Sequence, residues 1–254
     1  MGVIHKVFHK GRLRLHYTEA GSGPPVVLVH GLSGSRLWWR KNLPALSQEF
    51  RVYTVDLVGF GGSRRQRVLP LVESAALLSD WMKSLELGEP RLVGHSMGAH
   101  IALHVVTLKQ ARIAALVLVA ASALVRGAWW KLATRLPRAG LNGALDFLPT
   151  LAFDALRAGP RNLLRATQEI LRDDPGAHLA EVRVPTLLVW GERDVIVPRD
   201  LGEQLQRSIP GSRLVVIPGA GHNVMYDRPQ DFNRTVIPFL RDPGGAEAPL
   251  NAER

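Results

Sequence analysis

Short apolar runs recur along the chain, and most are followed by a segment whose apolar residues fall at helical spacing. Two early runs alternate between apolar and polar residues, which predicts an antiparallel hairpin. The later runs, such as PVVLVH at 25–30 and AALVLVA at 114–120, are continuous, as in parallel strands that are buried on both faces. The predicted strands are 3–8, 13–18, 25–30, 51–57, a run that begins at Arg91, 114–120, 185–190 and 213–217.

Helical patterns separate the later strands. In the segment 71–87, for example, Leu77, Leu78, Trp81 and Leu85 fall on one face of a helix. Strands that alternate with helices in this way predict an α/β fold with a doubly wound, mostly parallel sheet. The expected architecture is therefore an eight-stranded sheet with an N-terminal antiparallel hairpin and helices on both faces.

The alternation stops between about Ser122 and Glu181, where helix-like segments are broken by prolines and glycines and no strand pattern occurs. A stretch of nearly sixty residues is too long for a simple connection between two strands. It predicts a helical cap over the carboxyl edge of the sheet. We therefore expect a core at 1–122 and 182–242, a helical cap at 123–181 and a flexible polar tail at 243–254.

A serine stands between a strand-like run and a helix-like run in the sequence Gly94-His95-Ser96-Met97-Gly98. This is the G-x-S-x-G pattern of a nucleophile elbow in the required context. A serine oxygen that is exposed at the end of a strand needs a tight, strained turn. Side chains at positions 94 and 98 would collide with the neighbouring strand and helix, which explains the two glycines.

A serine is a poor nucleophile until a histidine accepts its proton, and that histidine needs an acid to orient it. Two later strand ends offer these groups, because Asp194 follows the strand that ends at Trp190, and His222 follows the strand that ends at Ile217. The rival carboxylates, Asp173, Asp174 and the neighbouring Glu192, are less suitable, since the first two are not at a strand end. The chain order is serine, aspartate, histidine.

With these motifs the chain resembles a known family, the cap-bearing α/β-hydrolases of the esterase, haloperoxidase and C–C hydrolase group. The resemblance extends over nearly the whole chain, and its pieces are weak alone but strong together. They are His30-Gly31 with Trp39, Asp56 with Gly59, Gly61 and Ser63, the elbow at 94–98, Gly191 to Asp194, and Gly219 to His222 with Asp227 and Pro229.

The resemblance implies a catalytic triad of Ser96 as nucleophile, His222 as general base and then acid, and Asp194 as the orienting carboxylate. It also implies an oxyanion hole made by the backbone N–H groups of Leu32 and Met97. Relatives that open epoxides or displace halide carry aspartate at the elbow, so a serine there disfavours those reactions. Acyl transfer to serine remains, with esters, thioesters, lactones or amides as substrates, as does serine-dependent C–C cleavage.

The cap supplies the substrate pocket in this family, and the predicted cap is apolar with many basic residues. The residues expected to line the pocket are His30, His95, Trp129, Trp130, Phe147, Phe153 and Val195. Of these, His30 is also expected to hold its loop. The apolar cap residues are either cap core covered by arginine stems, or part of a helix that contacts an anionic membrane surface. His100 and His104 are interpreted as packing residues, or as core histidines with satisfied hydrogen bonds, on the helix that follows the elbow.

Composition narrows the class of protein. The chain has 254 residues, of which 46% are hydrophobic, and this suits one large globular domain. It has no cysteine, no apparent signal peptide and no run long enough to span a membrane, so we expect a soluble, cytoplasmic protein. The net charge is +10, but the sequence contains no recognisable nucleic-acid-binding motif. We therefore expect no nucleic-acid partner, and we attribute the charge to a basic face that favours acidic substrates or a membrane surface.

These observations predict a carboxylesterase-like serine hydrolase that cleaves a hydrophobic carboxylic ester or thioester through an acyl-enzyme. We expect no cofactor and no metal, because the histidines and carboxylates show no ligand spacing. A C–C bond hydrolase or a lactonase is the alternative within the same fold. An alternative of another class is a ligand-binding or signalling protein that keeps the fold but turns over slowly. The natural substrate and the oligomeric state remain open.

Overall fold

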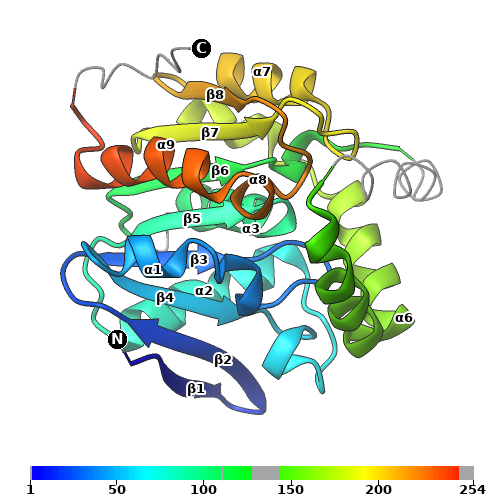
Figure 1. Cartoon of the computed structure of the whole chain (residues 1–254). Coiled ribbons are helices and arrows are strands. Elements are labelled where there is room, and N and C mark those ends of the chain that lie inside the picture. The colour runs from blue at the N-terminus through cyan, green and yellow to red at the C-terminus, as the bar shows by residue number, and fades with distance from the viewer. Residues whose placement is uncertain (1, 110, 128–142, 246–254) are drawn as a thin grey trace.

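The apolar runs form one mostly parallel sheet (Figure 1). The computed structural model describes residues 2–109, 111–127 and 143–245. Within these ranges the sheet has eight strands in the order β1-β2-β4-β3-β5-β6-β7-β8. The strands are β1 (Ile4–Lys10), β2 (Leu13–Ala20), β3 (Pro25–Val29), β4 (Arg51–Asp56), β5 (Arg91–His95), β6 (Ala115–Val119), β7 (Thr186–Gly191) and β8 (Arg213–Ile217).

Only the N-terminal strands are antiparallel. Strand β1 pairs with β2 and β2 pairs with β4 in antiparallel register, whereas every pairing from β4 through β3 to β8 is parallel. The predicted hairpin, the strand count and the mostly parallel sheet are therefore confirmed. Because the parallel strands share one direction, their carboxyl ends meet at one edge, which is on the right in Figure 1.

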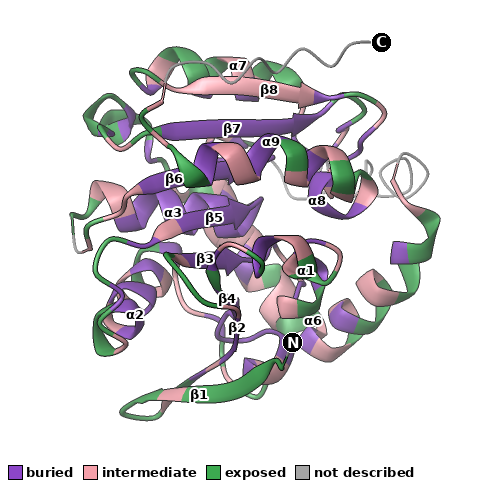
Figure 2. Ribbon diagram, turned by 60° about the vertical axis from the view of Figure 1, so that its left-hand side comes forward, coloured by how far each residue is buried: buried purple, intermediate pink, exposed green. Residues whose placement is uncertain are grey.

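Helices cover both faces of the sheet, as the alternation of patterns predicts. Helices α2 (Leu71–Ser84), α3 (Met97–Thr107) and α7 (Arg199–Ser208) cover one face, and α1 (Leu43–Leu46), α8 (Val224–Asp227) and α9 (Pro229–Arg241) cover the other. A hydrophobic core lies on each face of the sheet, and β3 contributes to both. Val27 and Val29 pack against the first group of helices, and Val26 and Leu28 pack against the second. Figure 2 shows these central strands buried and β1 exposed.

The segment between β6 and β7 contains helices and, in its described residues 120–127 and 143–185, no strand. Its elements are η3 (Ser122–Leu124), η4 (Leu145–Phe147), α6 (Leu148–Arg172) and η5 (Gly176–Glu181). Helix α6 is two helices joined at Gly159, whose φ of 77° is not helical, and the next residue is Pro160. Figure 1 shows α6 beside the carboxyl ends of the strands. The helical content is as predicted, while the exact limits of core and cap stay a prediction.

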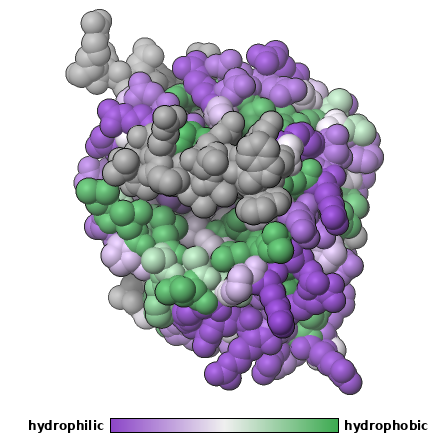
Figure 3. Space-filling model, turned by 90° about the vertical axis from the view of Figure 1, so that its right-hand side faces the viewer, coloured by the Kyte–Doolittle hydropathy of each residue, from purple (hydrophilic) through white to green (hydrophobic). Residues whose placement is uncertain are grey.

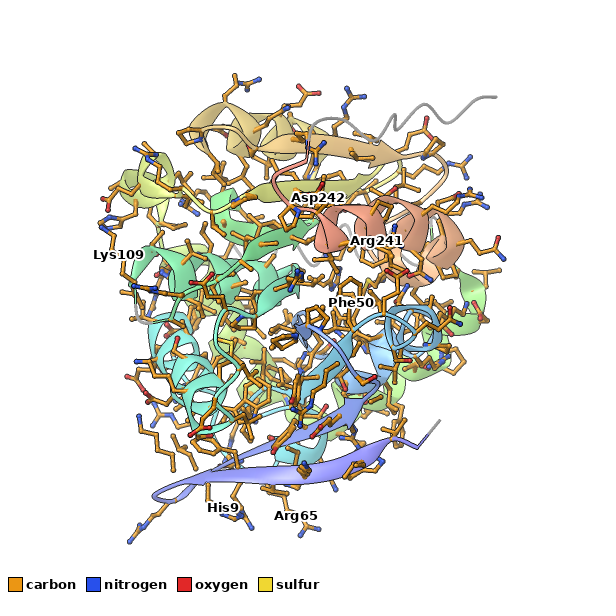
Figure 4. The ribbon with its side chains drawn as sticks, turned by 90° about the vertical axis from the view of Figure 1, so that its left-hand side faces the viewer. His9, Phe50, Arg65, Lys109, Arg241 and Asp242 are labelled. Atoms are coloured by element: carbon orange, nitrogen blue, oxygen red, sulfur yellow. The ribbon has the colours of Figure 1, made fainter. Side chains whose placement is uncertain are left out.

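The opposite edge of the sheet carries the amino ends of the parallel strands. Figure 4 looks onto this edge, where Phe50, Lys109 and Arg241 are labelled. Phe50 is buried directly before β4, and Arg241 at the end of α9 forms a salt bridge with Glu49 at 2.7 Å. In the described part of the chain, no helix is both long enough and apolar enough to cross a lipid bilayer.

Candidate active site

Ser96 lies in a tight turn between β5 and α3, at the carboxyl edge of the sheet. Its backbone has φ 52° and ψ −113°, a conformation that is costly for any residue with a side chain. A Cβ at Gly94 would lie 2.4 Å from the carbonyl oxygen of Gly98, and a Cβ at Gly98 would lie 2.4 Å from that of His30. Glycine is therefore required at both positions, and the chain makes the turn that the spacing predicts.

Three side chains meet at this turn although they come from three separate strand ends. His222 Nε2 lies 3.1 Å from Ser96 Oγ, and His222 Nδ1 lies 2.8 Å from Asp194 Oδ2. Since a carboxylate only accepts, Nδ1 carries the proton and Nε2 is free to accept from the serine hydroxyl. The other carboxylate oxygen, Oδ1, accepts from the backbone N–H groups of Ile196 and Val197, each at 2.9 Å. Asp194 is thereby held in one orientation.

The rival carboxylates point elsewhere. Glu192 is exposed, and its Oε2 accepts from the backbone N–H of Gly219 at 2.8 Å. Asp173 contacts His100 and His104 rather than His222. Among the side chains that the structure describes, Asp194 is the one carboxylate in hydrogen-bond contact with the imidazole of His222.

A half-buried aspartate supports the loop that carries His222. Asp227 accepts from the backbone N–H of Gly221 at 2.9 Å and from that of Ala144 at 2.8 Å. Burial raises the pKa of Asp227, although these two hydrogen bonds oppose the rise. This carboxylate joins the residues around His222 to the start of the helical segment that leads into α6.

The loop after β3 lies against the nucleophile. His30 is fully buried, accepts from the backbone N–H of Leu57 on Nε2 at 3.0 Å, and donates from Nδ1 to the carbonyl of Gly31 at 2.8 Å. A Cβ at Gly31 would lie 3.1 Å from Ser96 Cβ, so the backbone of this loop closely approaches the serine. The next residue, Leu32, borders the same cavity as Ser96, and Met97 begins α3.

A cavity of about 490 Å³ extends from Ser96 and His222 to α6. Its walls are mostly apolar. The core contributes Leu32, Trp38, Ile196 and Val197, the residue after η3 contributes Val125, and α6 contributes Leu148, Leu151, Ala155, Leu163 and Ile170. Of the described residues that line it, none is Arg, Lys, Asp or Glu. The polar lining includes Ser96 and His222 at the strand ends and Thr167 on α6.

The expected pocket lining needs correction. His95 does line the cavity, but His30 is enclosed behind it by its two backbone hydrogen bonds. Phe147 is buried behind Trp38 and stacks on Tyr226, with ring centroids 3.9 Å apart.

Two other residues that were expected to line the pocket, Phe153 and Val195, do not line it, each for its own reason. Phe153 faces outward, is 54% exposed and lies under the guanidinium of Arg157. Val195 does not line the cavity, because the turn closed by Asp194 presents Ile196 and Val197 instead. The remaining two expected lining residues, Trp129 and Trp130, lie outside the described residues.

The cavity residues on α6 had a signal in the sequence. Leu163, Thr167 and Ile170 all line the cavity and are spaced by three and four positions, which is one face of a helix.

The role of Asp154 has no comparable signal in the sequence. This buried carboxylate accepts from Trp38 Nε1 at 3.0 Å and from Ser35 Oγ at 2.8 Å, and so fixes α6 against the core.

A cluster of two histidines and one carboxylate lies between α3 and the end of α6, away from Ser96. His100 and His104 are four residues apart on α3, a spacing that places two imidazoles on one face of a helix. Both rings contact the same oxygen of Asp173, which the sequence places about seventy residues later. Burial would raise the pKa of Asp173, but the hydrogen bonds from the two imidazoles outweigh burial and lower it to about 2.

The chain belongs to the alpha/beta hydrolase family, whose model matches residues 26–235. This match includes the sheet from β3 to β8 together with Ser96, Asp194 and His222. The chain is therefore a member of a family of hydrolases.

Curated relatives extend over almost the whole chain. The chain is 27% identical to the 2-hydroxy-6-oxo-6-(2'-aminophenyl)hexa-2,4-dienoic acid hydrolase of Metapseudomonas resinovorans, over 93% of this chain and 91% of that one. It is 29% identical to the pimeloyl-[acyl-carrier protein] methyl ester esterase of Nitrosomonas europaea, over 86% and 96%. Among solved structures, a thermophilic esterase from Thermogutta terrifontis superposes with a TM-score of 0.79 at 25% identity, over 96% and 100%.

Proposed function

We propose that this protein is a serine hydrolase that cleaves a carboxylic ester or thioester with a hydrophobic acyl or alcohol part. The observation that carries the proposal is the hydrogen-bonded chain from Ser96 through His222 to Asp194 at the floor of an apolar cavity. A nucleophile, a base and an orienting acid are within reach of one bound carbonyl group.

The proposed reaction has two halves. Ser96 Oγ attacks the carbonyl carbon while His222 Nε2 takes the hydroxyl proton, and Asp194 stabilises the resulting imidazolium. The oxyanion would be bound by the backbone N–H groups of Leu32 and Met97, the second of which lies at the positive end of α3. His222 then gives its proton to the leaving alkoxide or thiolate, which leaves an acyl-enzyme. Water, activated by His222, attacks the acyl-enzyme and releases the acid.

The cavity lining favours an uncharged substrate. A buried carboxylate on the substrate would need a cationic partner, because an unpaired charge is costly in an apolar site. No described lining residue is cationic. This observation supports an ester with an apolar part over the alternative suggested by the first relative, whose name specifies a dienoic acid as its substrate.

The test compares p-nitrophenyl esters that differ in acyl length and charge. We expect kcat/KM to rise from acetyl to octanoyl, and the monoester of a dicarboxylic acid to be slower than the uncharged ester of equal length. A preference for acetyl, or for the anionic acyl group, would overturn the proposed substrate class. Faster turnover of a 2-hydroxy-6-oxo-dienoate than of any ester would favour C–C cleavage instead.

Labelling with a fluorophosphonate separates a hydrolase from a ligand-binding protein that keeps the fold. The folded protein should be modified at Ser96, whereas heat-denatured protein should not. An active serine hydrolase serves as the positive control. If the folded chain resists the reagent while the control reacts, the protein does not use Ser96 as a nucleophile.

We also propose that the outer face of α6 contacts an anionic membrane surface. Of the exposed large apolar side chains in the described residues, five lie on η4 and α6, namely Leu145, Leu148, Phe153, Leu156 and Leu164, and Leu148 also borders the cavity. Figure 3 shows apolar side chains gathered around a hollow on this face of the molecule. The net charge of +10 would favour anionic lipid, and the apolar residues would enter the interface.

A further inference from the structure

Helix α3 presents two imidazoles to the end of α6. The Nε2 atoms of His100 and His104 lie 2.6 and 2.7 Å from the same oxygen, Oδ2 of Asp173. The two rings are stacked, with centroids 5.3 Å apart and an angle of 16° between their planes. The three ligand-capable atoms lie within 4.8 Å of one another. Two nitrogen donors and one carboxylate oxygen thus converge on one point.

The cluster is buried but not sealed. The side chain of His100 has no exposed surface, and that of His104 is 10% exposed. The carboxylate of Asp173 is 21% exposed, so a small ion could reach the cluster from the side of Asp173. His100 Nδ1 is buried and has no hydrogen-bond partner among the described residues, so the contact with Asp173 places the ring proton on Nε2, and a bound ion would take the place of that proton.

We propose that His100, His104 and Asp173 form a binding site for one divalent transition-metal ion, with zinc as the best match. Imidazole nitrogen and carboxylate oxygen are ligands that zinc accepts, and three protein ligands leave the fourth position of a tetrahedral ion to water. Each imidazole would bind the ion through Nε2 and carry its proton on Nδ1. No redox chemistry is involved.

Binding an ion would require the three ligand atoms to rearrange. Ligands of a tetrahedral zinc ion lie about 3.3 Å apart, given metal–ligand distances of about 2.0 to 2.1 Å. The present contacts of 2.6 and 2.7 Å are shorter, so the carboxylate would move outward by less than about 1 Å. Asp173 can make this movement because it is the C-cap of α6, beyond the last helical residue. The two Nε2 atoms lie within 4.8 Å of each other, and rotation of the imidazole side chains would bring them to about 3.3 Å.

A bound ion would link the cavity wall to the helix of the nucleophile. Leu163, Thr167 and Ile170 on α6 line the cavity shortly before Asp173. On the other side, the backbone N–H of His100 donates to the carbonyl of Ser96 at 3.1 Å. The ion would therefore stabilise the folded chain and hold the second half of α6 against α3. It would not touch the reacting atoms.

The test measures metal binding directly, on untagged protein that has been stripped with EDTA. Co²⁺ is added as a spectroscopic probe, and Zn²⁺ affinity is measured by competition with a chromogenic chelator. We expect one ion per chain, visible absorption typical of tetrahedral Co²⁺, and a higher melting temperature with Zn²⁺. His104→Gln should weaken Zn²⁺ binding by at least about tenfold. His178→Gln is the matched control, since exposed His178 also contacts a carboxylate, that of Glu181 at 3.0 Å.

Three results would overturn the site. They are the absence of stoichiometric binding, unchanged Zn²⁺ affinity in His104→Gln, and an equal loss of affinity in His178→Gln. If His104→Gln fails to fold, Asp173→Asn replaces it, because the amide keeps the shape of the carboxylate but not its charge. That variant should also lose at least about tenfold in Zn²⁺ affinity, and retained affinity would reject the proposal.

Discussion

His95 Nε2 donates a hydrogen bond to the backbone carbonyl of His222 at 3.0 Å. Because a carbonyl only accepts, His95 must carry a proton on this nitrogen. Its own ring is fully buried, and burial lowers its pKa well below the usual value for histidine. The residue that precedes the nucleophile in the elbow thus holds the backbone of the proposed general base.

We expect His95→Phe to lower kcat by about two- to tenfold with little change in KM, because it removes this one hydrogen bond, worth about 0.5 to 1.5 kcal/mol. His95→Gln, whose amide can reach the same carbonyl, should retain more activity. Steady-state kinetics with an octanoyl ester measures both, and circular dichroism checks the fold. Equal activities of the two variants would contradict a positioning role for His95.

The strained turn at Ser96 predicts a conflict between stability and activity. Ser96→Ala and Ser96→Gly should both lose at least about 10⁴-fold in ester turnover, because neither has a nucleophile. Glycine relieves the strain at φ 52° and ψ −113°, whereas alanine does not. Urea unfolding should therefore find Ser96→Gly more stable than Ser96→Ala by about 1 kcal/mol. The opposite order would show that the turn stores no strain.

Periodicity and spacing were enough to predict the strands, the elbow and the meeting of Ser96, Asp194 and His222. The carboxyl ends of parallel strands meet at one edge, so residues that follow β5, β7 and β8 are brought together by topology alone. The pocket depends instead on how α6 packs. Its break at Gly159 and the anchor of Asp154 on Trp38 decide which side faces Ser96, and neither is set by local propensity.

The dependence on how α6 packs also explains why the sequence alone does not predict the cluster of His100, His104 and Asp173. The spacing of the two histidines on a helix is visible in the sequence, but the third group comes from a segment about seventy residues away. Whether Asp173 or the neighbouring Asp174 meets them depends on where α6 ends. In the structure, Asp173 is the C-cap and points to α3, while Asp174 pairs with Arg126.

Buried neutral histidines predict a loss of stability in mild acid. Burial lowers the pKa of both His30 and His95 from the ordinary value of 6.5. Below that pH the unfolded chain takes up protons that the folded chain does not, so the free energy of unfolding falls as pH decreases through 6.5. Each group contributes a slope of about 1.4 kcal/mol per pH unit until its folded-state pKa is reached.

His95→Gln tests this linkage. Its unfolding free energy is measured in urea from about pH 7.5 to pH 5.5. The slope of this free energy against pH should be smaller than that of the wild-type protein by about 1.4 kcal/mol per pH unit, which corresponds to the uptake of one proton. A control variant at an exposed histidine, His178→Gln, should keep the wild-type slope. Parallel slopes for His95→Gln and the wild-type protein would mean that His95 is protonated in the folded state.

The proposed membrane contact predicts a strong effect at Leu156, which is 81% exposed on α6. Leu156→Glu should weaken binding to anionic phosphatidylglycerol vesicles by at least about tenfold, since burying one leucine is worth about 2 kcal/mol. Vesicle flotation measures the bound fraction. Leu108→Glu is the control, because Leu108 is 38% exposed but lies next to Lys109, at the opposite edge of the sheet (Figure 4). Equal losses of vesicle binding in the two variants would indicate that the added negative charge governs binding, whatever its position.

The size of the cavity should determine which acyl chains fit. Ala155 lines the cavity from α6, and Ala155→Phe would place a ring in the space above Ser96. We expect kcat/KM for an octanoyl ester to fall by at least about tenfold while the value for an acetyl ester changes little. Ala177→Phe, at an exposed position in η5, controls for a general effect of the added ring. A proportional loss for both esters would instead mean that the longer chain does not occupy this cavity.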